Sequence, residues 1–211
     1  IEGKRYAGDV RLESVSGDIE VDQFVGSADI QSSSGYFEAE SIEGEAQVVT
    51  TSGNVSVRRI DGTAKLRSSS GDIELHEGSG GRTVKTTSGD ITLDGVEGVW
   101  SIETSSGETA LEAAEGSGSI VTTSGDIRLE IGKLSGNLDI QTSSGYANIK
   151  MSPDNAFDFR ASTSSGDIAT FFDDSLSFSK RGDDARGTYG ENSDGHEVKI
   201  KTTSGDIRIT K

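Results

Sequence analysis

The sequence predicts an all-β protein, a parallel two-sheet β-solenoid (β-helix) in which short coils of chain stack along one axis. The pair Ser-Gly recurs at a fixed period over most of the chain, with its glycine at positions 17, 35, 53, 71, 89, 107 and 125. A second glycine lies halfway between successive copies, and apolar and polar residues alternate between these glycines. Such a unit cannot bury its apolar side alone, whereas stacked units bury a continuous core. We therefore predict about ten 18-residue coils, with residue i lying on residue i+18.

The composition excludes several other classes. Among 211 residues there are 28 glycines but one proline, which argues against collagen and against a disordered Pro/Gly chain. A net charge of −16 disfavours binding to nucleic acid. Without cysteine there is no disulfide and no thiolate metal site, and the redox compartment stays open. No transmembrane segment is expected, because no apolar run approaches the ~18 residues required. The sequence opens at Ile1 rather than at methionine, so we expect further sequence upstream.

The Ser-Gly pairs mark one corner of each coil. Glycine supplies the backbone angles of a tight turn at no steric cost. The residue two before each serine is another Ser or Thr, which faces inward by the period of two. We expect these inner hydroxyls to form a ladder, each donating to the coil above and accepting from the coil below. The corner residues of the regular coils are Ser34, Gly35, Ser52, Gly53, Ser70, Gly71, Ser88, Gly89, Ser106, Gly107, Ser124 and Gly125.

Each half of a coil has the pattern of a strand with one wet and one dry face. After Ser-Gly the second and fourth residues are apolar in most coils, as at Ile73 and Leu75. After the lone glycine the fourth residue is apolar, as at Val84. The intervening positions are charged or polar, as expected for half-buried strands. We predict strands stacked ~4.8 Å apart and no helix before residue 150.

The period breaks near the C-terminus. Two extra residues enter around 132–134, and the last two Ser-Gly glycines, Gly166 and Gly205, lie slightly more than two periods apart. We interpret residues 171–195 as an insertion whose aromatic residues cover the open end of the solenoid, because a last coil without a cap offers free strand edges. Val198 to Ile209 are expected to return as the final coil. The prediction is one domain over 1–211, regular over 1–150 and irregular over 151–211.

The repeated motif resembles a known family. Thr-Ser-Gly-Asp-Ile occurs at 87–91, 123–127 and 203–207, and the last copy follows a glycine-rich insert and Val198-Lys199-Ile200. These features resemble the bacterial adhesin-like domains of unknown function known as toast-rack domains. The resemblance covers almost the whole chain. It implies a right-handed β-solenoid that often lies beside membrane-anchoring or envelope-stress modules, and it brings no catalytic residues.

Candidate catalytic and metal sites are few. The only histidines, His76 and His196, are isolated, so the many hydroxyls have almost no base to activate them and zinc has no ligand set. The prediction is therefore a non-enzyme without catalytic residues, cofactor or resident metal. A carbohydrate-active β-helix enzyme is the alternative. It would need carboxylates converging near the insertion, and the available ones are Asp173, Asp174, Asp183 and Asp184.

The charge is concentrated on one face. The outward positions after Ser-Gly carry fifteen acidic and four basic residues, whereas the opposite face mixes both signs. Calcium-binding rolls need Gly-Gly-x-Gly-x-Asp, which is absent, yet weak divalent-cation binding along stacked acids such as Asp72 and Asp90 remains open. The predicted interaction face comprises Asp18, Glu20, Glu38, Glu40, Asp72, Glu74, Asp90, Glu108 and Asp126.

These observations predict a structural or interaction module. A cationic ligand, such as a basic peptide or a positively charged surface, would suit the acidic face. The partner is expected to be a protein or a component of the cell envelope, and not nucleic acid. The resemblance places the domain at the cell envelope or outside the cell, with the cytoplasm left open.

Overall fold

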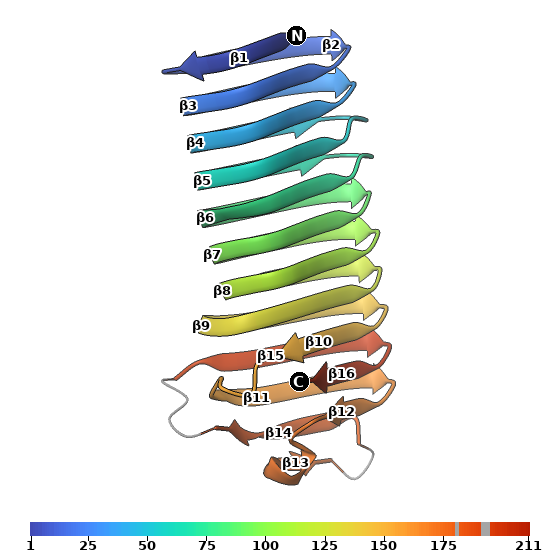
Figure 1. Cartoon of the computed structure of the whole chain (residues 1–211). Helices are drawn as coiled ribbons and strands as arrows, with labels where there is room; N and C mark the ends of the chain where they lie inside the picture. Colours follow the sequence, from blue (N-terminus) through green and yellow to red (C-terminus); the bar gives the residue numbers. More distant parts are fainter. Residues whose placement is uncertain (180–181, 191–194) are drawn as a thin grey trace.

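The computed structural model describes residues 1–179, 182–190 and 195–211, and within them the protein is almost entirely β-strand (Figure 1). The helical element of this part is one 3₁₀ turn, η1 (Asp173–Ser175). Eight coils stack in chain order. They consist of β1 (Glu2–Ala7) with β2 (Val10–Ser16), then β3 (Ile19–Ser34), β4 (Phe37–Thr50), β5 (Val55–Ser68), β6 (Ile73–Ser88), β7 (Ile91–Ser106), β8 (Thr109–Ser124) and β9 (Ile127–Ser144).

The register confirms the predicted stacking. Ile73 lies opposite Ile91 in a parallel pair, and Ile91 lies opposite Thr109. The same offset, one repeat of the sequence, relates all the paired residues from β3 to β8. The parallel solenoid is therefore confirmed, with eight rather than about ten coils following one another in order.

The two halves of a coil are less separate than the sequence suggests. Each strand from β3 to β9 continues around the lone glycine, so the predicted two sheets join there into one sheet folded on itself. At that corner Gly62 has φ of 136°, which favours glycine. A Cβ on Gly62 would also lie 2.0 Å from the carbonyl oxygen of Gly44 in the coil before. The glycine is thus required by the stacking of coils as well as by its own backbone angle.

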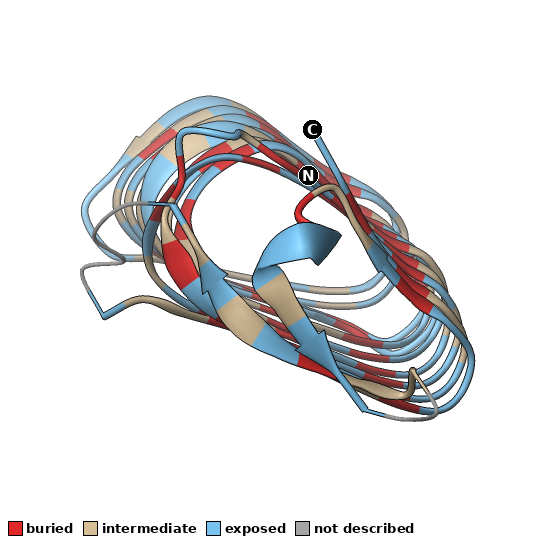
Figure 2. Cartoon of the chain, turned by 90° about the horizontal axis from the view of Figure 1, so that it is seen from below, coloured by how far each residue is buried: buried red, intermediate tan, exposed pale blue. Residues whose placement is uncertain are grey.

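The core fills the interior between the two long sides of each coil. Buried residues alternate with exposed ones along both sides (Figure 2). Ile73, Leu75 and Val84 are fully buried, as predicted. Large and small residues compensate for one another between coils: a Cβ on Gly118 would lie 2.5 Å from the ring of Trp100, so the glycine makes room for the indole.

The inner hydroxyls at the Ser-Gly corner do not form the ladder predicted from the sequence. They are mostly buried, and some of them bind the backbone of the turn, whereas others have no partner. The amides of Gly53 and Gly71 donate to Thr50 Oγ1 and Ser68 Oγ at 3.0 and 2.8 Å. The Ser68 hydroxyl also donates to the carbonyl of Gly53 in the preceding coil. Within the described part of the chain, the hydroxyls without a hydrogen-bond partner include Thr86, Thr122, Thr142 and Thr202. In the later coils the glycine amide of the turn donates instead to a serine carbonyl of the adjacent coil, as Gly89 does to Ser106, so it does not bind the inner hydroxyl.

The last strands do not stack in chain order, which corrects the prediction that Val198 to Ile209 form the final coil. They are β10 (Ala147–Met151), β11 (Phe157–Ser165), β12 (Ile168–Thr170), β13 (Leu176–Phe178), β14 (Asp184–Tyr189), β15 (Glu197–Ser204) and β16 (Ile207–Thr210). β15 lies between β9 and β11, and β16 lies between β10 and β12 (Figure 1). The C-terminal strand pair is therefore inserted between two coils that precede it in the sequence.

The connection from β10 to β11 makes this insertion sterically feasible, because it steps over one level of the solenoid. Asn155 fixes the step. Its side chain is buried, its Oδ1 accepts the Leu134 N–H at 2.8 Å, and its Nδ2 donates to the Gly132 carbonyl at 3.1 Å. The two extra residues noted around 132–134 thus supply the backbone groups that this asparagine binds.

The insertion covers the end of the solenoid, as predicted. β14 pairs antiparallel with β11, and β13 pairs antiparallel with β14. Phe171, Phe172 and Tyr189 pack against one another, with ring centroids 4.9 to 5.1 Å apart, and Phe172 also packs on Phe157 and Phe159 of β11. Residues 180–181 and 191–194 of the predicted insertion lie outside the described residues.

Candidate functional site

The aspartates that follow Ser-Gly have a structural role. Their carboxylates accept a hydrogen bond from the backbone N–H at the equivalent position of the next coil. The Tyr36 amide donates to Asp18 at 2.8 Å, the Asp90 amide to Asp72 at 2.9 Å, and the Glu108 amide to Asp90 at 2.7 Å. Asp126 accepts in the same way from Tyr146. This geometry explains why Asn54, which also offers a side-chain oxygen, can stand in the same column.

This column bears on the divalent-cation alternative. Asp72 and Asp90 do stack, but each already uses a carboxylate oxygen to bind the neighbouring coil. Within residues 1–179, 182–190 and 195–211, no group of three or more His, Asp or Glu side chains is arranged to hold a metal ion. The structure offers no support for cation binding along this face.

The remaining predicted face residues divide into two groups. Glu40 pairs with Arg58 at 3.1 Å, and Glu108 pairs with Arg128. Glu20, Glu38 and Glu74 are exposed, and their carboxylates have no hydrogen-bond or ion-pair partner among the described residues. These three are the members of the predicted face whose carboxylates make no polar contact within the described part of the chain.

Glu20 and Glu38 belong to a larger group at the N-terminal end of the rod. Glu2 of β1 lies opposite Glu20, and Glu20 lies opposite Glu38, so three carboxylates stand in one column. Asp22 lies two residues further along β3 and is also exposed. We call Glu2, Glu20, Asp22 and Glu38 the acidic patch. Glu2 was missed by the sequence analysis, although its spacing of one repeat from Glu20 is visible in the sequence.

The same face carries both basic and acidic residues toward the C-terminal end. Because β16 is inserted beside β10, Arg208 lies opposite Asn148, and both line a groove of about 230 Å³ with Arg128 and Lys150. Lys150 pairs with Glu130 at 2.8 Å, and Arg128 pairs with Glu108. Two of the three basic residues of the groove are thus neutralised by glutamates, whereas the carboxylates of the acidic patch, at the N-terminal end of the rod, are unpaired among the described residues.

A second charged group lies at the lone-glycine corner between β5 and β6. Asp61 accepts from Arg59 Nε at 2.7 Å and from the Ser79 amide at 3.2 Å. The hydrogen bond from Arg59 holds the pKa of Asp61 below its usual value, and the same contact raises the pKa of Arg59. This group joins the two coils at the surface of the corner.

Arg82 lies inside this corner and was missed by the sequence analysis. Its side chain is buried, and its guanidinium donates to the carbonyls of Ile60 at 2.7 Å and Gly62 at 3.2 Å. Burial lowers the pKa of Arg82. Its column holds alanine in three preceding coils, at Ala28, Ala46 and Ala64. Other coils have a larger residue at the position of Gly78. This glycine is the signal in the sequence that could have indicated space for the guanidinium.

The carboxylates proposed for an enzymatic alternative each have separate surroundings. Asp173 accepts from the amide and hydroxyl of Thr170, beside η1. Asp183 is hydrogen-bonded to Ser179, and Asp184 pairs with Arg186 at 3.0 Å. Asp174 is exposed in η1. The contacts do not join these carboxylates into an acid and base pair.

The stacked coils, the Ser-Gly corners and the aspartate column define a class of protein, the parallel β-solenoid built from 18-residue repeats. A family model described as Toastrack DUF4097 matches residues 4–97 and again 81–210. The chain belongs to this family of domains of unknown function. The two overlapping matches agree with a domain made of similar coils.

Comparisons with curated proteins and with solved structures found no match. No helix in the described part of the chain has the length and apolar character to cross a membrane.

Proposed function

We propose that this domain is a non-enzymatic, adhesin-like interaction module that holds a cationic partner against its acidic patch. The observation that carries the proposal is the column formed by Glu2, Glu20 and Glu38, in which each carboxylate lies opposite the next. Like charges directly opposite one another in a sheet destabilise it. A basic peptide, or a basic surface of a protein or envelope component, would relieve this repulsion.

The rest of the solenoid supports a role in presentation. Backbone pairing runs without interruption from β3 to β5, and the aspartate column adds a side-chain bond between coils. Such a rod keeps the patch at a fixed position relative to the far end. We place the module at the cell envelope or outside the cell, as the resemblance to domains beside envelope modules implies, and fractionation of cells that produce the full protein would test this location.

A binding assay with charge-reversal variants tests the patch. The probe is a fluorescent decalysine peptide, measured by anisotropy at about 0.15 M salt. Changing Glu20→Lys and Glu38→Lys together should weaken binding by roughly tenfold or more, because both carboxylates and their potential are lost. The matched control is Glu97→Lys with Glu115→Lys, a second exposed pair of stacked glutamates elsewhere on the rod.

Equal weakening in both double variants would show a general effect of net charge and would refute the patch. The non-enzyme part of the proposal has its own test. Incubation with a panel of bacterial and plant polysaccharides should release no new reducing ends, and their appearance, abolished by Asp173→Asn or Asp174→Asn, would overturn it.

A further inference from the structure

The intercalated strand pair occupies a gap that the rest of the chain leaves open. β10 and β11 are joined by residues 152–156 alone, yet they lie on different levels with β15 and β16 between their coils. The gap is one coil high. Its walls are β9 and β10 on one side and β11 and β12 on the other.

The bonds across this gap are the same as those between ordinary coils. The Gly145 amide donates to the Ser204 carbonyl at 3.1 Å, and the Gly205 amide donates to the Ser165 carbonyl at 2.9 Å. Thr202 lies opposite Thr142 on one side and Thr163 on the other. None of these contacts depends on which chain the inserted strands come from.

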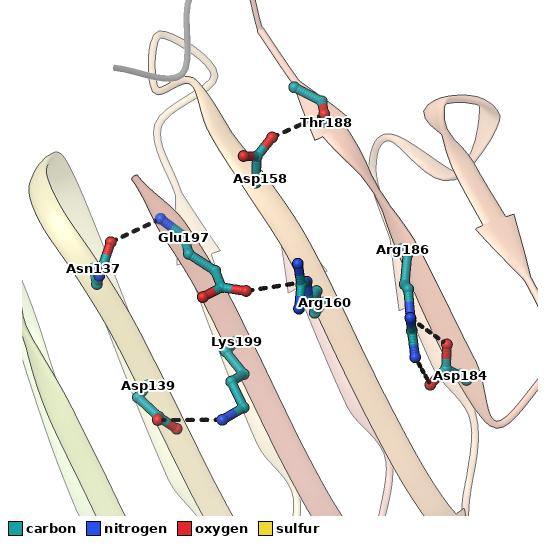
Figure 3. Close-up of polar contacts among 9 residues, drawn as sticks. All are labelled: Asn137, Asp139, Asp158, Arg160, Asp184, Arg186, Thr188, Glu197 and Lys199. Atoms are coloured by element: carbon teal, nitrogen blue, oxygen red, sulfur yellow. Dashed lines mark hydrogen bonds and ion pairs between the residues drawn. The ribbon is translucent and has the colours of Figure 1, made fainter. Parts of the chain in front are cut away.

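Polar and charged contacts hold this segment between the walls of the gap (Figure 3). The Glu197 amide donates to Asn137 Oδ1 at 2.9 Å, and its carboxylate pairs with Arg160 at 3.1 Å. Lys199 pairs with Asp139 at 3.7 Å. An acid followed two residues later by a base recurs at these positions in Asp9 with Arg11 and in Asp158 with Arg160, but Glu with Lys occurs in this segment alone among the aligned coils.

The order of the strands also leaves the gap open during folding. β11 and β12 precede β15 and β16 in the chain, and in the folded sheet β15 and β16 are the strands that join them to β9 and β10. Until β15 and β16 pair with them, the edges of β9 and β10 carry unpaired backbone groups, which are a template for pairing with another chain. Repeat proteins are prone to exchange of this kind.

We propose that this gap is an exchange site that takes β15 and β16 from a second copy of the chain, giving a strand-exchanged dimer. Each copy then supplies its C-terminal strand pair to the other and receives the same pair in return. The contacts are those of the single chain, so the dimer forms when chains fold together at high concentration, where the second copy competes with the chain's own segment.

Cross-linking tests the exchange without background, because the chain has no cysteine. Gln141 on the β9 wall and Lys201 on the inserted β15 are exposed neighbours. One chain carries Gln141→Cys, and a second, larger chain with a mass tag carries Lys201→Cys. The two are unfolded, mixed, refolded at high concentration and joined with a short bis-maleimide. We expect a cross-linked heterodimer that increases with the concentration at refolding.

The matched control uses Val49→Cys and Arg67→Cys, which are neighbours in the same column but within the coils that stack in chain order. This mixture should give no heterodimer above background. The single chain carrying both Gln141→Cys and Lys201→Cys should cross-link internally when refolded dilute. Internal cross-linking without any heterodimer at high concentration would overturn the exchange, and absence of the internal cross-link would overturn the gap itself.

Charge exchange provides a second measurement. One chain carries Asp139→Lys with Arg160→Glu in the gap, and the other carries Glu197→Lys with Lys199→Asp in the strand. Each chain alone is mismatched, whereas the exchanged heterodimer has matched pairs in both of its gaps. The heterodimer fraction should rise on the order of tenfold over the unmodified mixture at low salt, and an unchanged fraction would contradict the assigned pairing.

Discussion

The stacking of glycines predicts a graded series of alanine substitutions. Gly62→Ala should be severe, because φ is 136° and the new Cβ would lie 2.0 Å from the Gly44 carbonyl oxygen. Gly17 has φ of 108° but nothing within 4 Å of a Cβ, so Gly17→Ala isolates the backbone term. Gly81 has open space and no left-handed angle, so Gly81→Ala is the control.

The expected losses in the free energy of unfolding have two causes, the unfavourable backbone angle and the close approach of the new Cβ to the neighbouring coil. Holding alanine in a sparsely populated backbone region costs about 1–3 kcal/mol, which is the expected loss for Gly17→Ala. Gly62→Ala carries the same term and also forces the coils apart, so we expect a loss of about 3–5 kcal/mol, at the exceptional end of point substitutions. Gly81→Ala should be neutral or stabilise by up to about 1 kcal/mol, because alanine restricts the unfolded chain.

Urea unfolding followed by circular dichroism measures the series, with the midpoint and slope compared for each variant. A change in slope for Gly62→Ala would indicate local opening of coils, as expected in a repeat protein. The reasoning fails if Gly62→Ala and Gly17→Ala lose the same free energy of unfolding. In that case the backbone angle alone would explain the lone glycines, and the close approach between coils would not matter.

Two further predictions concern the corner between β5 and β6. Arg82→Ala should reduce the free energy of unfolding by about 2–4 kcal/mol in urea unfolding, because it removes the donors to the Ile60 and Gly62 carbonyls and leaves a cavity; an unchanged midpoint would show that the guanidinium is dispensable. The second prediction concerns pH. The pKa of Asp61 is lower in the folded state than its unfolded value of about 3.9, so the charged carboxylate stabilises the folded state above that pH. This stabilisation is lost as the pH falls through the lower, folded pKa. Asp61→Asn should flatten this acid limb in unfolding measured from pH 6 to 2, and an unchanged limb would contradict the assignment.

The register of the first eight coils could be predicted from the sequence because each column repeats its chemistry at a fixed spacing. Ile73 and Ile91 had to stack for both to be buried, and they do. The role of the aspartate column could not be predicted in the same way. An aspartate that is only solvated and an aspartate that accepts a hydrogen bond from the next coil's amide look the same in the sequence. The hydrogen bond from the Asp90 amide to Asp72 distinguishes the two roles.

Arg82 was missed because the prediction rested on what a column shares, whereas this residue departs from its column. Three preceding coils have alanine at this position, and only the coincidence with Gly78 makes room for a guanidinium. A departure of this kind requires two columns to be considered together. The sequence alone gives no measure of the distance between them.

The intercalated coil shows where repetition limits prediction. Because equivalent coils expose the same bonding groups, backbone pairing does not distinguish β11 stacked on β9 from β15 stacked on β9. Few side chains distinguish the two strand orders. They are Asn155, which fixes the connection over one level, and Glu197 and Lys199, which form ion pairs with the walls of the gap. Repetition therefore makes the coils up to β9 easy to predict, but it leaves the order of the last coils to a few side chains. The same repetition makes the gap accessible to a second copy of the chain.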